Sequence, residues 1–278
     1  MVTPEPLCYH HLPVTVARKE TPLGSAETEL AFFDANAFIG RPVQGVARPA
    51  ATADDLLAEM DRNGIDRALV WHIAQHDLAP VVGNRMLAEQ IGPHDRLVGC
   101  WTILPSCLPE FPKPDDLVAQ MKDARVRALR VFPEPHHYLL RREVLGPVLW
   151  TMVERRIPLI LSNARGSGWP AIYDLLDDLP DLVCVTSDYG CWGADRWFRP
   201  LLDHYEHVYV DLADYLLDGG IEALVADYGP ERLLYGSGFP VQYPGGMMMT
   251  IRHAEIDPAD RQAIAAGNLD RVLGEVQL

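Results

Sequence analysis

The sequence has no long hydrophobic segment. No run in its 278 residues approaches the roughly 20 consecutive apolar residues that a membrane-spanning helix needs. The first residues, MVTPEPLCYHHLPVTVARKE, also lack the basic region and following apolar stretch of a secretory signal. We therefore expect a cytoplasmic protein that has no membrane partner.

Cysteine and positive charge are both scarce. The five cysteines are odd in number and form no CxxC pair, so we expect neither a disulfide framework nor a cysteine-rich zinc site. The 24 Lys and Arg residues are outnumbered by 39 Asp and Glu residues, which gives a formal charge of −15 with neutral histidine. Nucleic acids and anionic membranes attract basic surfaces, so we expect neither of them as a partner.

Two common catalytic motifs are missing. No serine lies in a GxSxG elbow, and no GxxxxGK[ST] loop is present to bind phosphates. The stretch GSGWPA at 166–171 imitates a dinucleotide-binding fingerprint, because Asp188 follows about 20 residues later. However, Trp169 adds bulk beside the turn and the motif lies mid-chain. We interpret it as a flexible turn before a helix, whose free N–H groups could hold an anionic group beside Arg165.

An alternation of strand and helix patterns fills most of the chain. Eight short apolar runs are each followed by a stretch with helical spacing, at 30–36, 66–72, 96–104, 127–132, 157–163, 182–187, 207–212 and 232–237. Such alternation predicts a parallel sheet, and over about 250 residues its closed form is a (β/α)₈ TIM barrel. An open doubly wound sheet is the alternative. We expect residues 1–29 to be an irregular lead-in, and 30–278 to form one α/β barrel with extra C-terminal helices.

Polar residues stand where the predicted strands end. The carboxyl ends of barrel strands share one mouth, which is where barrel enzymes place their sites. Our catalytic candidates are Asp34, Asn36, Ser162 and Asp188, and our substrate-binding candidates are His72, Arg130, His136, Asn163, Arg165 and Ser237. Buried charges need partners, so the alternative is that Asp34, Asp188 and Arg130 only neutralise one another.

The ten histidines suggest a metalloenzyme at first sight, but their positions do not favour one. His72, His76, His136 and His137 follow the second and fourth predicted strands and could approach the mouth. Histidines in such loops are more often solvated or turned toward substrate than bound to metal. A metal site built from these four residues stays open as an alternative.

Nine fragments of the chain carry a family resemblance. In order they are AFFDANAFIGRP, LLAEMDRNGIDRALV, GPHDRLVGCWTILP, RALRVFPEPHHYLL, IPLILSNARG, LVCVTSDYG, VYVDLAD, ERLLYGSGFPV and AIAAGNLDRVLG. Together they resemble the amidohydrolase-related family, the branch of TIM-barrel metal-dependent hydrolases and decarboxylases that includes relatives of aminocarboxymuconate-semialdehyde decarboxylase. The resemblance covers nearly everything after residue 30, and it implies a homo-oligomer, for which we expect a homodimer.

The same resemblance implies ligand positions that hold other residues here. They are Asn36 and Phe38 in place of H-x-H after the first strand, Ser162 (or Asn163, in a register one residue later) after the fifth, Asp188 after the sixth, and Gly238 in place of the aspartate of G-S-D-x-P after the eighth. A catalytic zinc needs about three protein ligands. Phenylalanine and glycine side chains donate none, and neutral amide or hydroxyl oxygens bind zinc poorly. We therefore predict a site without metal and without another cofactor.

The remaining residues suit acid–base chemistry on a small molecule. Asp188 could transfer a proton, Arg130 and Arg165 could clamp a carboxylate, and Asn36 with Ser162 could donate to a developing oxyanion. This set of residues predicts metal-independent hydrolysis, decarboxylation or isomerisation of a carboxylate- or lactone-containing substrate. One alternative is a catalytically inactive barrel that binds a small molecule or a partner protein. Another is a metal-dependent hydrolase with relocated histidine ligands.

Overall fold

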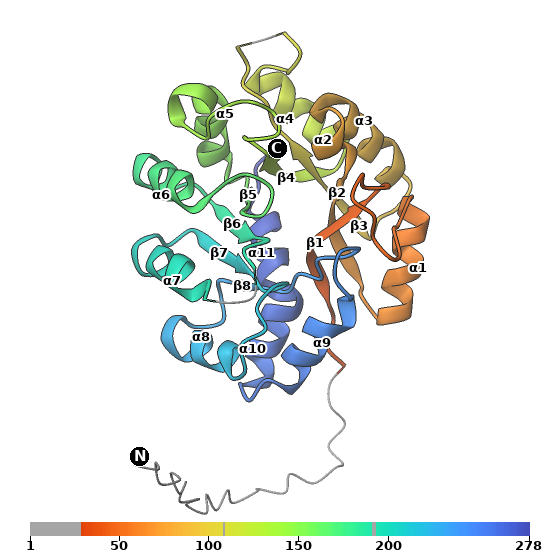
Figure 1. The fold of residues 1–278 in the computed structure, drawn as a ribbon, viewed down its shortest axis with the longest axis vertical. Helices are drawn as coiled ribbons and strands as arrows, with labels where there is room; N and C mark the ends of the chain where they lie inside the picture. The colour runs from red at the N-terminus through yellow and green to blue at the C-terminus, as the bar shows by residue number, and fades with distance from the viewer. Residues whose placement is uncertain (1–28, 108, 191–192) are drawn as a thin grey trace, which may run out of the picture.

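Eight parallel strands form one sheet, and their order in space is their order in the sequence (Figure 1). The computed structural model describes residues 29–107, 109–190 and 193–278. The strands are β1 (Phe33–Ile39), β2 (Arg67–His72), β3 (Leu97–Thr102), β4 (Val126–Val131), β5 (Leu159–Ser162), β6 (Cys184–Ser187), β7 (Val208–Asp211) and β8 (Leu233–Leu234). Each overlaps a predicted run, although β1 begins three residues later than its run and continues past Asn36.

The sheet closes on itself between β8 and β1. The Ala35 N–H donates to the Tyr235 carbonyl at 2.8 Å, and the Phe38 N–H donates to the Phe239 carbonyl at 3.0 Å. The chain after β8 therefore continues alongside β1 in parallel. The predicted TIM barrel is confirmed, and the open-sheet alternative is wrong.

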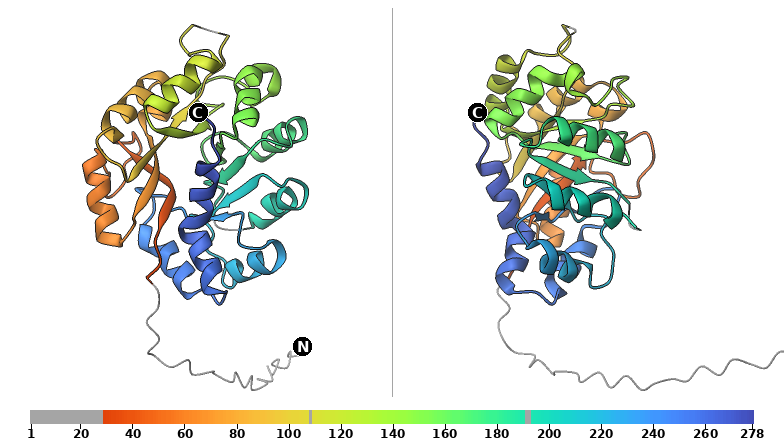
Figure 2. Two further views of the ribbon diagram at one scale, coloured as in Figure 1. Left: turned by 180° about the vertical axis from the view of Figure 1, so that it is seen from behind. Right: turned by 90° about the vertical axis from the view of Figure 1, so that its left-hand side faces the viewer.

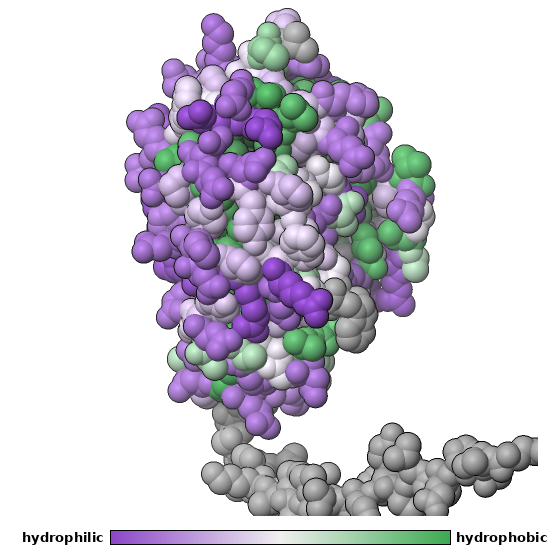
Figure 3. Space-filling model, turned by 60° about the vertical axis from the view of Figure 1, so that its left-hand side comes forward, coloured by the Kyte–Doolittle hydropathy of each residue, from purple (hydrophilic) through white to green (hydrophobic). Residues whose placement is uncertain are grey.

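Helices surround the barrel and alternate with its strands (Figure 1). They are α1 (Ala53–Asn63), α2 (Ala74–Asp77), α3 (Pro80–Ile91), α4 (Pro114–Asp123), α5 (Arg142–Arg155), α6 (Trp169–Asp178), α7 (Asp195–His204), α8 (Gly220–Tyr228), α9 (Pro244–His253), α10 (Pro258–Gln262), a π-helical segment (Ala263–Gly267) and α11 (Asn268–Gly274). The side of the molecule seen in Figure 3 is mostly hydrophilic with scattered hydrophobic patches, as the acidic composition leads one to expect.

Local sequence signals set several helix ends. Thr52 accepts from the Asp55 N–H and Asp55 accepts from the Thr52 N–H, which makes a capping box before α1. Gly64 ends α1 in the left-handed conformation at φ 72°. The turn before α6 uses two glycines at positive φ, Gly166 at 101° and Gly168 at 61°. The interpretation of GSGWPA as a turn leading into a helix is confirmed.

The C-terminal helix closes the end of the barrel opposite the long loops (Figure 2). Leu269, Val272 and Leu273 of α11 pack against interior side chains of the strands, including Phe33 and Leu69. This apolar plug leaves the carboxyl ends of the strands as the accessible end, which we call the mouth. The chemistry of the barrel must therefore be sought there.

Some sequence-based expectations fall on residues outside the described ranges. The lead-in predicted for 1–29 is one of them, except for Glu29. Cys8 and Cys191 also lie outside, whereas Cys100, Cys107 and Cys184 are free thiols. Within the described ranges, none of the helices combines the length and apolar character required to cross a bilayer.

Asp34 stabilises the seam of the barrel, which is the place where β1 meets the chain that follows β8. Its Oδ1 atom accepts from the Asn36 N–H at 3.0 Å and from the Ser237 N–H at 2.8 Å, and the side chain is buried. We placed Asp34 among the catalytic candidates, and the structure places its side chain in the wall of the barrel. Both N–H groups depend on this one oxygen atom.

Asp34→Ala should lower the free energy of unfolding by about 3 kcal/mol, because two buried N–H groups lose their acceptor. Asp34→Asn keeps an oxygen at the same place and should lose about 1 kcal/mol or less. Urea unfolding followed by circular dichroism measures both values. Equal losses in the two variants would show that the Oδ1 contacts do not hold the seam.

Candidate active site at the barrel mouth

A cavity of about 750 Å³ opens at the mouth. Its walls come from strand ends and from the loops after β1, β2, β5, β6, β7 and β8. Among its lining residues are Asn36, Trp71, His76, Arg165, Asp188 and Asp214. It therefore joins three of the predicted site residues, Asn36, Arg165 and Asp188, with one of the four histidines expected near the mouth, His76, and with groups such as Asp214 that we did not choose from the sequence.

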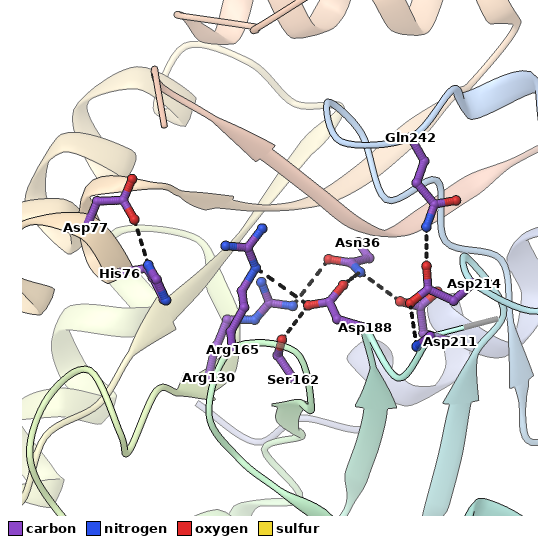
Figure 4. Close-up of polar contacts among 11 residues, drawn as sticks. Asn36, His76, Asp77, Arg130, Ser162, Arg165, Asp188, Asp211, Asp214 and Gln242 are labelled. Carbon is purple, nitrogen blue, oxygen red and sulfur yellow. Dashed lines mark hydrogen bonds and ion pairs between the residues drawn. The ribbon is translucent and has the colours of Figure 1, made fainter. Parts of the chain in front are cut away.

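The Asn36 side chain is the hub of the polar contacts below this cavity (Figure 4). Its Nδ2 atom donates to Asp188 Oδ1 and to Asp211 Oδ2, both at 2.9 Å. Its Oδ1 atom accepts from Arg130 Nη2 at 3.3 Å. The amide orientation is self-consistent, because its nitrogen faces two carboxylates and its oxygen faces a guanidinium.

Asp188 presents its carboxylate to the cavity from the end of β6. Ser162 Oγ donates to Asp188 Oδ2, and Arg165 Nε lies 3.8 Å from the same oxygen. The backbone of Asp188 is left-handed at φ 50°, which is costly for a residue other than glycine. The Ala164 N–H donates to the Asp188 carbonyl at 2.8 Å and helps to hold this conformation. Asp188 is thus a partly exposed carboxylate fixed by three side-chain partners.

Two arginines lie against the indole of Trp71. The guanidinium of Arg130 lies 4.6 Å from the centre of the Trp71 ring, and that of Arg165 lies 5.2 Å from it. Arg130 is 1% exposed, and its Nε and Nη1 atoms have no hydrogen-bond partner within the described residues. Burial lowers the pKa of the Arg165 guanidinium, while the adjacent Asp188 opposes this effect. The site therefore concentrates positive charge with unused donors beside an aromatic wall.

Asp211 belongs to the site although we did not choose it from the sequence. It is buried at the end of β7, where its Oδ1 atom accepts from the Ala213 N–H at 2.9 Å. A β-carbon on Gly236 would stand 1.9 Å from Asp211 Oδ1, so only glycine leaves room for this carboxyl group. Its position at a strand end was a usable signal, because the same signal identified Asp188.

Asp214 extends the acidic side of the cavity. It accepts from the Gly190 N–H at 3.1 Å and from Gln242 Nε2. Burial raises its pKa, and the charge of Asp188 adds to the effect. Gln242 thus connects the loop after β8 to the loop after β7.

Several predicted residues lie near the mouth without lining the cavity. His72 is buried, and its Nδ1 atom accepts from the Ala74 N–H at 3.1 Å at the start of α2. Ser237 Oγ accepts from the Phe239 N–H at 3.0 Å.

Two further predicted residues also lie outside the cavity lining. The ring of His136 stands edge-on to Phe132, with 5.9 Å between the ring centroids. The side-chain nitrogen and oxygen of Asn163 are buried without a partner in the described residues. Of the four histidines that we expected near the mouth, His76 lines the cavity, whereas His72, His136 and His137 are not among its lining residues.

Gly236→Ala should destabilise the fold by about 1–3 kcal/mol, since the new methyl group must displace the Asp211 carboxyl group or the backbone. Gly246→Ala is the matched control, because a β-carbon there meets open space within α9. The control should unfold at the same urea concentration or a slightly higher one. A Gly236→Ala variant as stable as the control would contradict this description of the packing around Asp211.

Burial raises the pKa of Asp211 well above its ordinary value, and the charges of Asp188, Asp34 and Asp214 raise it further. At pH values between the unfolded and the folded pKa of Asp211, the folded protein therefore keeps a proton on Asp211 that the unfolded chain has released. This contribution to stability is complete below the unfolded pKa of about 3.9 and declines as pH rises toward the folded pKa.

Asp211→Asn cannot ionise, so the variant should gain stability relative to the natural chain as pH rises. Between about pH 5 and pH 8 we expect the difference in unfolding free energy to shift toward the variant by at most about 1.4 kcal/mol per pH unit. Urea unfolding at several pH values measures this shift. A difference that does not change with pH would show that Asp211 ionises normally in the folded state.

The comparisons with known proteins agree with this architecture. An uncharacterised TIM-barrel protein from Bordetella bronchiseptica superimposes with a TM-score of 0.69 and 18% identity, covering 88% of this chain and 99% of that one. 2,6-Dihydroxybenzoate decarboxylase from Rhizobium gives 0.68 and 15%, over 88% and 99%. A manganese complex of 5-carboxyvanillate decarboxylase from Novosphingobium aromaticivorans gives 0.65 and 13%, over 90% and 97%. At these identities the likeness shows the fold.

The family itself is shown by sequence. No curated protein matches the chain significantly. The family described as Amidohydrolase, however, matches residues 8–274, which is almost the whole chain. Together with the eight-stranded barrel and its mouth, this match establishes that the chain belongs to the amidohydrolase family.

Proposed function

We propose that this protein acts on a small carboxylate-bearing molecule at the barrel mouth by acid–base chemistry that does not use a divalent metal. The observation that carries the proposal is the placement of Asn36 Nδ2 between the carboxylates of Asp188 and Asp211. An N–H₂ group that donates to both carboxylates takes the place in which a cation would otherwise hold them together.

The donor set of this mouth does not fit a catalytic metal. Ser162 directs its hydroxyl proton to Asp188, and the Asn36 carbonyl oxygen accepts from Arg130. The Phe38 ring packs on Trp71 with 4.8 Å between centroids, and Gly238 offers no side chain. A zinc or manganese ion would need about three protein ligands with free lone pairs.

The alternative that relies on relocated histidines requires a cluster of ligands. Across 29–107, 109–190 and 193–278, no three His, Cys, Asp or Glu side chains gather closely enough to hold a metal ion. We therefore derive no step through a metal. The positive charge of the site comes from Arg130 and Arg165.

The arginines support a carboxylate substrate. A buried guanidinium with unused donors favours an acceptor that carries negative charge, and a carboxylate can accept two such hydrogen bonds. Arg165 lines the cavity, and the guanidinium groups of Arg130 and Arg165 both lie against the Trp71 indole. Structural neighbours are named for 2,6-dihydroxybenzoate and 5-carboxyvanillate, both of which are carboxylates.

Asp188 is the group that we assign to proton transfer. It lines the cavity, and hydrogen bonds from Asn36 and Ser162 orient its carboxylate. Arg165 Nε lies 3.8 Å from Asp188 Oδ2. A carboxylate held in this way beside the cavity can take a proton from water or substrate and return it later. Lactone hydrolysis, decarboxylation and isomerisation all require such a step, and Arg130 or Arg165 can stabilise the oxyanion that develops.

A panel of carboxylates tests the proposal: 2,6-dihydroxybenzoate, 5-carboxyvanillate and the lactone 2-pyrone-4,6-dicarboxylate, for which another structural neighbour is named. We expect turnover of at least one compound at an unchanged rate in the presence of a strong chelator. Asp188→Asn should lower kcat by about 100-fold or more. Asp95→Asn, at a fully exposed carboxylate, is the control and should keep the rate.

Loss of turnover in chelator, with recovery on adding zinc or manganese, would refute metal independence. Ligands that raise the melting temperature without being turned over would identify a binding barrel and refute the acid–base assignment. Full activity of the Asp188→Asn variant would remove Asp188 from the proton-transfer role.

A further inference from the structure

A second acid–base pair stands across the cavity from Asp188. His76 Nδ1 lies 2.6 Å from Asp77 Oδ1, and both residues line the cavity from α2, directly after β2. Asp188 follows β6, which is the strand opposite β2 in an eight-stranded ring. Figure 4 shows the two arginines between His76 and Asp188. His76 and Asp188 therefore line one cavity from opposite strands of the barrel.

The surrounding contacts fix α2 tightly. Gln75 Nε2 donates to the Cys100 carbonyl at 3.1 Å, and Thr102 Oγ1 donates to Gln75 Oε1 at 3.2 Å. A β-carbon on Gly83 would lie 2.3 Å from the Gln75 nitrogen, so α3 packs directly on this turn. The His76 ring stands edge-on to Phe132 at 4.9 Å. These contacts hold the imidazole at one place on the cavity wall.

Asp77 also binds the loop that arches over the cavity. This loop, residues 41–49, which we call the strap, is closed at its base by the Gly40 N–H donating to the Ala50 carbonyl at 2.8 Å. Near its start, the Val43 N–H donates to Asp77 Oδ2 at 2.9 Å. Among the described residues, this is the hydrogen bond that ties the strap to the rest of the barrel. Strap residues 42–47 line the cavity.

The two oxygens of Asp77 thus serve two different partners. Oδ1 accepts from His76, which requires the proton of the neutral imidazole on Nδ1 and leaves Nε2 free as an acceptor. Oδ2 accepts from the strap. A carboxylate behind an imidazole fixes its tautomer and the orientation of its ring, which is the usual support for a histidine that transfers protons.

We propose that His76 is a second proton-transfer group of this site, and that Asp77 is a positioning residue that orients His76 and fastens the strap over the bound substrate. The acid–base role of His76 rests on the proposed function, whereas the coupling through Asp77 does not. Asp188 and His76 would then act on opposite faces of one substrate, one giving a proton while the other takes one.

The coupling is tested in the intact protein without any substrate. Nitrogen NMR of isotope-labelled histidine, with His76→Gln used for assignment, should show His76 in the Nδ1–H tautomer. Asp77→Ala should shift His76 toward the Nε2–H tautomer, because Nδ1 loses its acceptor. It should also speed hydrogen exchange of the strap amides by about tenfold, since the Val43 N–H loses a charged acceptor. Asp54→Ala is the matched control, because Asp54 pairs with His94 away from the mouth. Asp54→Ala should change neither the His76 tautomer nor the exchange rate of the strap amides.

The acid–base role is tested with whichever panel compound is turned over. His76→Gln should lower kcat by about 100-fold with little change in KM, and Asp77→Ala should lower kcat less. Normal turnover of His76→Gln alongside loss in Asp188→Asn would overturn the role of His76 but leave the proposed function standing. Absence of turnover in the natural chain would overturn both. An unchanged tautomer and strap in Asp77→Ala would overturn the coupling.

Discussion

The hydrogen bonds of the Asn36 amide are the interaction on which the mouth depends. One nitrogen donates to two carboxylates that come from β6 and β7, and the amide oxygen accepts from an arginine on β4. Four strands of the barrel, including β1 itself, therefore meet at one neutral side chain. The charge of Asp188 is one cause of the raised pKa of Asp211, and the Asn36 amide bridges the two side chains.

A neutral hub changes how the charge of the site is balanced. An amide contributes no net positive charge, so the acidic groups must be compensated by other means. Arg130 and Arg165 supply two positive charges, and the raised pKa of Asp211 disfavours a second negative charge beside Asp188. This explains why an arginine as deeply buried as Arg130 is tolerated, although its Nε and Nη1 atoms have no hydrogen-bond partner among the described residues.

Much of this could be predicted from sequence, because the signals are local. Strand-length apolar runs, the capping box at Thr52 and the left-handed stop at Gly64 depend only on near neighbours, and the structure confirms them. The shared mouth follows from the parallel topology, so Asn36, Arg130, Ser162 and Asp188 were found as a set from their strand-end positions.

The individual roles were harder to predict, because they depend on contacts between distant parts of the chain. Asp34 bonds to Ser237, some 203 positions away, and so lies in the seam of the barrel. Asp211 fits only because Gly236 lacks a side chain. His76 reaches the cavity while His72 turns to the backbone of α2, a choice that depends on how the short helix packs.

The most direct test of the account is a titration of chelator-treated protein with manganese(II), followed by electron paramagnetic resonance. If Asn36 takes the place of a cation, the spectrum should remain that of the hydrated ion, with no binding that depends on Asn36 or Asp188. Stoichiometric binding that disappears in Asp188→Asn would contradict the account, because it would place a metal at the position that we assign to the amide.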